Sequence, residues 1–205
     1  MAHPRVLIDR QSALVAVDIQ RDFCKGGALA VKDGEAVVPV MNQYLEIFQT
    51  RRFPIYITRD WHPKGHISFK PRGPWPPHCV QNTPGADFHP DLNLPAAAEI
   101  ISKGCEIDHD AYSDFDRTDF VLRLRSKGVR KLFIGGLATD YCVGSTVVDG
   151  LYYGLQVFFL ADASRGVNVK PEDSKHAIEE MEKYGAQSIT FRNLDLQSAA
   201  AEDWQ

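Results

Sequence analysis

Hydrophobic and polar residues follow two patterns along this chain. Short apolar runs rich in β-branched residues predict buried strands, and apolar residues spaced three or four positions apart predict helices. The first run, Ser12–Val17, ends at Asp18 and is typical of a strand that is buried on both faces. A helical stripe follows over 35–48. Its apolar positions are Val37, Val40, Met41, Tyr44, Leu45 and Phe48.

The same alternation continues to the end of the chain. Further strands are predicted at 54–59, 98–102, 131–134, 155–160 and 188–191. Further helices are predicted over 117–127 and 141–153 and from Pro171 onward. Gly128 and Gly154 follow two of these helices, where glycine commonly ends a helix. Strands that alternate with helices form right-handed βαβ units, so the sequence predicts an α/β fold with a mostly parallel sheet.

One segment, 61–95, does not follow either pattern. It is dense in proline, glycine and histidine, which predicts a long ordered loop. Loops of this length in a compact domain are usually functional. Since the chain has no internal repeat, low-complexity tract or linker, we expect a single domain over residues 1–205.

Composition and charge limit the classes of partner and the cellular location that we expect for this protein. The chain has 23 Lys and Arg against 27 Asp and Glu, and its basic residues are scattered, so no nucleic-acid partner is expected. No apolar run is long enough to span a bilayer, and the first residues lack the regions of a signal peptide. The four cysteines are far apart and form no CxxC pair. These features predict a cytoplasmic protein with reduced thiols and no membrane partner.

Cys142 has an unusual position. An apolar strand pattern runs into Gly135 and Gly136, the chain turns, and Cys142 follows where a helical pattern begins. The free N–H groups and the dipole at a helix N-terminus favour a thiolate. A small buried core residue is the simpler interpretation of a lone cysteine.

Two other polar residues end predicted strands: Asp18 and Lys103. Strand ends meet at the same edge of a parallel sheet, so Asp18, Lys103 and Cys142 are expected to converge. A lysine would lower the pKa of the cysteine, and a carboxylate could carry its proton. Taken one at a time, Asp18 could be a helix cap and Lys103 a strand-end charge; their joint position favours catalysis.

A second cluster follows the strand at 54–59. Asp60 and His62 are separated by one residue, and His78 follows in the proline-rich loop. Two or three imidazoles with one carboxylate suit Zn²⁺, Fe²⁺ or Mn²⁺. Turn chemistry in a polar loop is the alternative, but a further histidine near the candidate thiol favours a metal.

Together these residues resemble the nicotinamidase/pyrazinamidase group of the isochorismatase-like cysteine hydrolases. The matching motifs are VDIQRDF at 17–23, TRDWHP at 58–63, WPPHCVQN at 75–82, KG at 103–104, AYS at 111–113, GGLATDYCV at 135–143 and DASRGV at 162–167. They follow one another in the order of the family and span nearly the whole chain.

The resemblance implies a Rossmann-like, mostly parallel central sheet of about six strands with helices on both faces. It implies a catalytic triad of Asp18, Lys103 and Cys142. It also implies a cis peptide bond between Leu137 and Ala138, and an oxyanion hole formed by the amides of Ala138 and Cys142.

The resemblance further implies one divalent metal ion, held by Asp60, His62 and His78, with His66 as a further ligand. Zinc is the expected ion, and iron and manganese are the alternatives. The substrate would lie among Phe23, Trp75, Tyr112 and Gln20; taken as lone aromatic residues, the first three fit the core better than a pocket wall. The implied reaction, in NAD salvage, converts nicotinamide to nicotinic acid and ammonia through a thioester, with pyrazinamide as a second substrate.

Other functions are weighed against this one. Relatives that hydrolyse carbamoyl or ureido compounds or maleamate share the triad but generally lack the metal site, and isochorismatases proper lack the cysteine. A non-catalytic binding module would be expected to lose a triad residue or a ligand. A dinucleotide-binding oxidoreductase would need GxGxxG after the first strand, which is absent.

Apolar residues such as Leu151, Tyr152 and Tyr153 either form a homo-oligomer interface or pack beneath the sheet.

Overall fold

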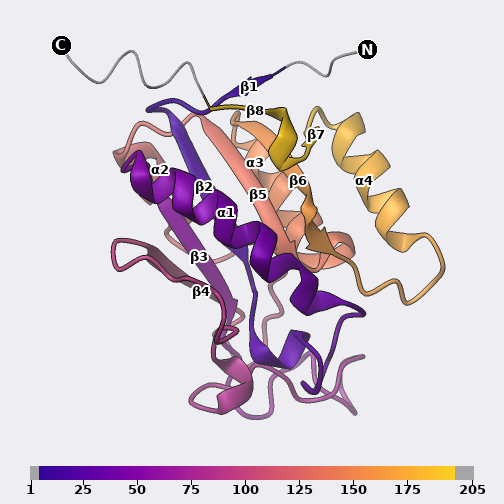
Figure 1. Ribbon diagram of the computed structural model, residues 1–205. Coiled ribbons are helices and arrows are strands. Elements are labelled where there is room, and N and C mark those ends of the chain that lie inside the picture. Colours follow the sequence, from indigo (N-terminus) through magenta and orange to yellow (C-terminus); the bar gives the residue numbers. More distant parts are fainter. Residues whose placement is uncertain (1–4, 197–205) are drawn as a thin grey trace.

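Six parallel strands form the central sheet of the computed structural model, which describes residues 5–196 (Figure 1). The strands are β2 (Ser12–Val17), β3 (Ile55–Asp60), β4 (Glu99–Lys103), β5 (Lys131–Leu137), β6 (Gln156–Arg165) and β7 (Gln187–Ile189), in the order β4-β3-β2-β5-β6-β7. The helices are α1 (Val37–Thr50), α2 (Phe120–Ser126), α3 (Gly144–Tyr152) and α4 (Asp173–Lys183). The predicted α/β architecture is confirmed.

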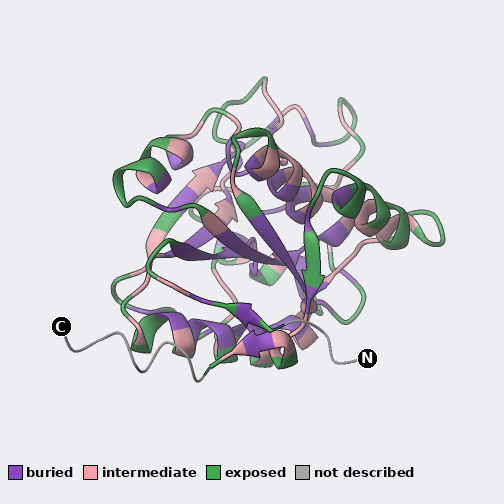
Figure 2. Ribbon diagram, turned by 90° about the horizontal axis from the view of Figure 1, so that it is seen from above, coloured by how far each residue is buried: buried purple, intermediate pink, exposed green. Residues whose placement is uncertain are grey.

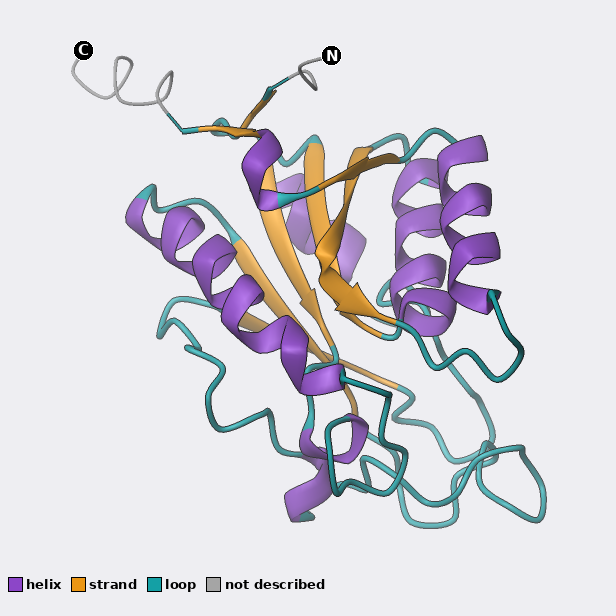
Figure 3. Cartoon of the chain, turned by 45° about the vertical axis from the view of Figure 1, so that its right-hand side comes forward, coloured by secondary structure: helices purple, strands orange, loops and turns teal. Residues whose placement is uncertain are grey.

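The strands lie between two hydrophobic cores, because successive side chains of a strand point to opposite faces. Leu14 and Ala16 of β2 pack in the core that contains the apolar face of α1. Ala13, Val15 and Val17 pack in the core that contains residues of α2, α3 and α4. Figure 2 shows the buried strands between these helix layers, and Figure 3 shows α1 separated from the other helices by the sheet. Burial on both faces explains the unbroken apolar run of β2.

Among the α-helices of residues 5–196, α1 is the one that packs on this face of the sheet. Its buried residues recur three and four positions apart, as the sequence pattern predicts; they are Val37, Val38, Met41, Tyr44, Leu45 and Phe48. Pro39 lies in the first turn, where a helix needs no N–H donor. The helix begins two residues later than predicted because a 3-10 turn, Gly34–Ala36, precedes it.

The strand order changes direction between β2 and β5. The chain runs outward from β2 through β3 to β4 on one side, and from β5 through β6 to β7 on the other. The carboxyl ends of β2 and β5 are direct neighbours, with Val17 paired to Gly136. A Cβ atom on Gly136 would lie 2.0 Å from the Val17 carbonyl oxygen, so this close approach requires glycine. In parallel sheets such a switch point is where ligands bind.

Most connections at this end of the sheet are long. The segment between β3 and β4 contains only isolated bridges and one 3-10 turn, Pro84–Ala86, which confirms the predicted ordered loop. In Figure 1 it extends below the strand ends, together with the segment between β4 and α2. These loops surround the switch point.

Some strands and helices begin or end at other residues than the sequence pattern predicts. Strands β5 and β6 continue three and five residues further, to Leu137 and Arg165, because their last residues pair with each other past a register shift. A π-helical turn, Thr139–Val143, precedes α3, and α2 is shorter than predicted. The sequence pattern also missed a small parallel pair, β1 (Val6–Leu7) and β8 (Leu194–Asp195), since two-residue strands carry no periodicity.

Within residues 5–196, none of the helices has the length and apolar character required to cross a membrane. At the end of α3, Leu151 packs against the core while Tyr152 and Tyr153 are exposed. A role for these tyrosines between copies of the chain stays a prediction.

Candidate active site

Lys103 lies at the centre of the predicted site. It is the last residue of β4, paired in register with Asp60 of β3, and its side chain is fully buried. Its ammonium donates to Asp18 Oδ2 at 2.5 Å and to Asp60 Oδ1, and it lies 3.4 Å from the sulfur of Cys142. Burial alone would lower the pKa of Lys103, but the neighbouring carboxylates hold this pKa well above its ordinary value. The lysine therefore stays charged in the interior.

Asp18 follows β2 directly, with a positive φ of 48° that turns the chain away from the strand. Oδ1 accepts a hydrogen bond from the Thr58 hydroxyl at 2.8 Å, and Oδ2 accepts from Lys103. Burial raises the pKa of Asp18 above its ordinary value; Lys103 opposes this rise and Asp60 adds to it. A carboxylate with a raised pKa is a stronger base, which suits a residue that receives a proton.

Cys142 lies in the π-helical turn between β5 and α3, and its side chain is buried. The predicted cis peptide bond between Leu137 and Ala138 is present. Burial raises the pKa of Cys142 well above its ordinary value, Lys103 opposes the rise, and the nearby carboxylates reinforce it. Lys103 acts in the predicted direction, but the predicted net lowering of this pKa is wrong: one cation shared with two carboxylates does not outweigh complete burial. The resting group is a thiol that needs a base.

Asp60, His62 and His78 form the predicted second cluster, and all three are buried. One ligand atom of each lies within 4.8 Å of the other two. His62 Nδ1 is 3.0 Å from the Gly104 carbonyl oxygen and His78 Nδ1 is 2.8 Å from that of Pro76. Bonds of this kind fix the ring orientation and leave Nε2 for an ion. One carboxylate and two imidazoles fit a divalent cation.

The charges of this cluster also fit a metal. Burial would raise the pKa of Asp60, but Lys103 and His62 hold it well below its ordinary value, so the group is a carboxylate. Burial lowers the pKa of His78, which favours its neutral ring. Burial would also lower the pKa of His62, but its contact with Asp60 raises this pKa above its ordinary value. Carboxylate and neutral imidazole are the forms that bind metals.

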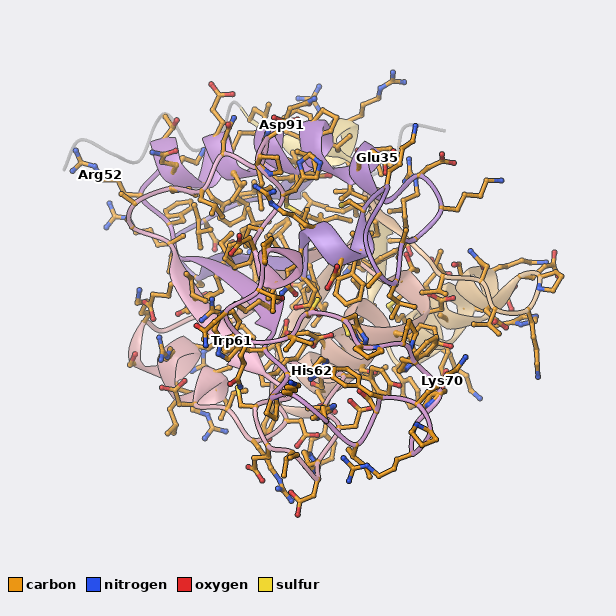
Figure 4. The ribbon with its side chains drawn as sticks, turned by 90° about the horizontal axis from the view of Figure 1, so that it is seen from below. Glu35, Arg52, Trp61, His62, Lys70 and Asp91 are labelled. Carbon is orange, nitrogen blue, oxygen red and sulfur yellow. The ribbon has the colours of Figure 1, made fainter. Side chains whose placement is uncertain are left out.

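Gly104 allows His62 to reach this position. A Cβ atom on Gly104 would lie 2.5 Å from the His62 ring, so any other residue would push the imidazole away. Gly104 also has a positive φ of 60°. Figure 4 looks onto this end of the molecule, with Trp61 and His62 labelled where the chain leaves β3. The glycine of the Lys103-Gly104 pair is therefore part of the metal cluster's support.

His66 lies beside the cluster without pointing a free nitrogen into it. Its ring stacks on that of His62, with centroids 4.2 Å apart. Nδ1 is 2.7 Å from the Ser68 hydroxyl, and Nε2 is 2.9 Å from the His109 carbonyl oxygen. Both ring nitrogens are thus in use in this arrangement, and the role of His66 as a metal ligand stays a prediction.

A cavity connects the two clusters. Besides Asp60, His62, His78, Ala138 and Cys142, its walls contain the three predicted aromatic residues, Phe23, Trp75 and Tyr112, and four residues that the sequence analysis missed, Leu29, Asp110, Tyr141 and Val167. The Trp75 indole donates to the Tyr112 hydroxyl at 3.1 Å. The aromatic walls are those of a pocket for a flat ring.

Val167 reaches the cavity because Asp140 holds its loop. The Asp140 carboxylate accepts backbone hydrogen bonds from Val167 at 2.8 Å and Asn168 at 2.7 Å. Those residues follow β6, whose end lies at the same sheet edge. The strand-end rule applied to β6 would have identified this segment, and Tyr141 is the direct neighbour of the predicted nucleophile.

Gln20, a predicted substrate contact, makes its side-chain hydrogen bonds to the backbone. Its amide nitrogen donates to the carbonyl oxygens of Asp60 at 2.8 Å and Ala86 at 2.9 Å, and its oxygen accepts from the Asp60 N–H at 2.8 Å. The side chain is fully buried and is not part of the cavity wall. Gln20 holds the backbone of Asp60 in place.

Comparisons with known proteins agree with this geometry. Residues 12–192 match the family described as Isochorismatase domain. The chain is 40% identical to a nicotinamidase of Escherichia coli, over 89% of this chain and 96% of the relative. It resembles the structure of a Pyrococcus horikoshii pyrazinamidase in complex with zinc, with 49% identity, a TM-score of 0.85 and coverage of 88% and 99%. It also resembles the structure of PnC1 from L. infantum in complex with nicotinate, with 33% identity, a TM-score of 0.87 and coverage of 93% and 98%.

Replacing Gln20 tests its role as a support. Gln20→Leu leaves three buried backbone groups without their partner, and each such group costs about 1–3 kcal/mol of folding free energy. We expect a lower free energy of unfolding in a urea titration and weaker metal binding. Gln81→Leu is the matched control, because Gln81 is half-buried and makes one such bond, to Trp61. Equal losses in the two variants would contradict the assignment.

Proposed function

This chain belongs to the isochorismatase family, and we propose that it acts as a nicotinamidase, hydrolysing nicotinamide to nicotinic acid and ammonia. One observation carries the proposal: the buried thiol of Cys142, which contacts Lys103 and through it Asp18, lines the same cavity as a carboxylate and two imidazoles that suit a divalent ion. Pyrazinamide, with a similar ring and the same carboxamide, is a second substrate of the proposed enzyme.

The cavity walls orient the ring of the substrate. Phe23, Trp75 and Tyr112 provide flat apolar surfaces for it. A divalent ion held by Asp60, His62 and His78 would supply a Lewis acid for the ring nitrogen. Zinc is the ion we propose, in keeping with the zinc complex of the similar pyrazinamidase. Fixing the carboxamide near Cys142 can contribute roughly 7–11 kcal/mol in the best intramolecular models.

Acylation begins with the Cys142 thiol. Its proton passes to Asp18 as the sulfur attacks the carboxamide carbon, and Lys103 stabilises the negative charge on sulfur. The oxyanion of the tetrahedral intermediate accepts hydrogen bonds from the amides of Ala138 and Cys142; one such donor is typically worth about 2.7–4 kcal/mol. Asp18 then transfers its proton to the nitrogen, the C–N bond breaks and ammonia leaves.

Deacylation repeats these steps with water. Asp18, again a carboxylate, accepts a proton from a water molecule that attacks the thioester carbon. The C–S bond breaks, the sulfur regains a proton from Asp18, and the acid leaves. One carboxylate thus serves as base and acid in both halves, which suits its raised pKa.

The alternatives have less support. A hydrolase of another small amide would use the triad but would leave His62 and His78 without a purpose. A non-catalytic module would not need the buried contacts of Lys103 with Asp18 and Cys142.

We further propose that the matched region belongs to one domain that spans residues 1–205.

Removal of the proposed nucleophile tests covalent catalysis. Cys142→Ala should lower ammonia release from nicotinamide by several orders of magnitude, because no other group can form the thioester. Metal content and the unfolding transition should stay as in the unmodified protein. Cys105→Ala, which removes an exposed thiol, is the control. Activity retained in Cys142→Ala would exclude a cysteine nucleophile.

A second variant tests proton transfer. Asp18→Asn keeps the size of the side chain but cannot accept the thiol proton. Ammonia release should fall by about 10²–10⁴-fold, the usual contribution of general acid–base catalysis. Binding of nicotinamide, measured by calorimetry, should change little. A near-normal rate would show that another group is the base.

Metal analysis tests the ligand set. His62→Ala and His78→Ala should each lower the metal bound per chain and raise KM, because each removes a predicted ligand. His176→Ala, at an exposed position on α4, is the control. His66→Ala decides the fourth ligand: full metal content in this variant, measured by mass spectrometry after dialysis, would exclude it. Normal metal content in His62→Ala would remove His62 from the set.

A further inference from the structure

Asp22 is a carboxylate that the mechanism above does not use. It lies after the end of β2, in the 3-10 turn Arg21–Phe23, and belongs to neither the triad nor the metal cluster. Oδ2 accepts a hydrogen bond from the Cys79 N–H at 2.7 Å, and Oδ1 accepts one from the Ala28 N–H at 3.1 Å. Hydrogen bonds to an ionised oxygen are roughly twice as strong as those between neutral groups. The carboxylate therefore joins segments of the chain that are distant in sequence.

Each segment that Asp22 joins contributes to the cavity wall. Phe23, Leu29 and His78 line the cavity, and each is the direct neighbour in sequence of Asp22 or of a residue bonded to its carboxylate. The Asp22 carbonyl oxygen also accepts from the Leu29 N–H at 2.9 Å. The rings of Phe23 and His78 lie close together, with centroids 5.6 Å apart. The position of Asp22 thus affects three residues of one wall.

Cys79 connects Asp22 with the two histidines of the metal cluster. It follows His78 directly, and its carbonyl oxygen accepts from the His62 N–H at 3.0 Å. Cys79 is fully buried and has a positive φ of 45°, a left-handed conformation that is unfavourable for a residue with a side chain. Such a conformation persists only where the surroundings hold it. The bonds to Asp22 and to His62 hold the backbone of Cys79 from both sides.

Gly85 leaves the room that the Asp22 carboxylate needs. A Cβ atom on Gly85 would lie 2.2 Å from Oδ2, the oxygen that accepts from Cys79. Because both oxygens of Asp22 are bonded, the carboxylate cannot move aside without lengthening one of these bonds. The 3-10 turn Pro84–Ala86 is therefore packed against a side chain that is fixed in place.

We propose that Asp22 is a positioning residue: through the Cys79 N–H, its carboxylate sets the separation of His62 and His78 at which both imidazoles bind one divalent ion. By holding the segment before Leu29, the same carboxylate keeps the adjoining wall of the cavity in place. Asp22 acts through these residues and is not itself among the ligands of the cluster.

Zinc binding tests the proposal without any substrate. Asp22→Asn keeps the size of the side chain, but its NH₂ group would face one of the two N–H donors. Loss of a group that orients metal ligands typically weakens metal binding about 10–100-fold, so we expect a rise of that size in the Kd for Zn²⁺, measured by competition with a chromophoric chelator. Asp33→Asn, which replaces an exposed aspartate, is the control and should bind zinc as the unmodified protein does. An unchanged Kd in Asp22→Asn would overturn the proposal, as would an unmodified protein that binds no zinc.

Gly85→Ala is a second variant, which keeps the carboxylate but displaces it. It should also raise the Kd for Zn²⁺, because the added methyl group collides with Oδ2 of Asp22. If Asp22→Asn does not fold, Gly85→Ala decides. Weaker zinc binding in this variant supports the role of the contact, and binding equal to that of the unmodified protein overturns it.

The kinetic effect rests on the proposed nicotinamidase function. With zinc in excess, Asp22→Asn should raise the KM for nicotinamide several-fold and change kcat little, because Asp22 supports the metal ligands and the cavity wall rather than the triad. A mere loss of folded protein would lower kcat at constant KM, and that result would overturn the positioning role. An unmodified protein that releases no ammonia from nicotinamide contradicts the proposed function, whereas the zinc titrations still decide the role of Asp22.

Discussion

The charge of Lys103 is the constraint on which the site depends. A fully buried ammonium is tolerated only when opposite charges surround it. Here Asp18 and Asp60 both accept hydrogen bonds from it. The same contacts fix the two carboxylates, one beside the candidate nucleophile and one beside the two histidines. Removing either carboxylate would leave a buried charge without its partner. The lysine therefore joins the two halves of the site into one electrostatic unit.

The sheet brings these groups together. Asp60 and Lys103 are neighbours in register on adjacent strands, and Asp18 and Cys142 follow the two strands that flank the switch point. Strands β2, β3 and β5 are buried on both faces, so their register cannot slip without moving apolar residues out of a core. The geometry of the site is thus maintained by hydrophobic packing that lies outside it.

The position of each residue relative to the strands decides which parts of the site could be predicted from the sequence. Asp18 and Lys103 were identifiable because each ends a strand pattern, and Asp60 because it precedes His62 by two positions with a further histidine in the loop. The role of Gln20 was not identifiable, since its partners are backbone atoms of residues distant in sequence. Nor was the position of Asp110 in the cavity wall, since this residue lies in a segment without periodicity. The predicted direction of the Cys142 pKa shift was wrong for a related reason. This pKa depends on the sum of burial and three charges, which no local motif contains.

Asp60 contributes to both clusters, and this limits what its replacement can reveal. Oδ1 accepts from Lys103, and Oδ2 lies 3.5 Å from His62 Nε2 in the metal cluster. A variant without this carboxylate would lose a metal ligand and, at the same time, one of the two charges that keep Lys103 buried. Its inactivity would not distinguish the two causes. His78, whose Nδ1 bonds only to the backbone of Pro76, has no such second role, so replacing it separates metal binding from the charge balance of the triad.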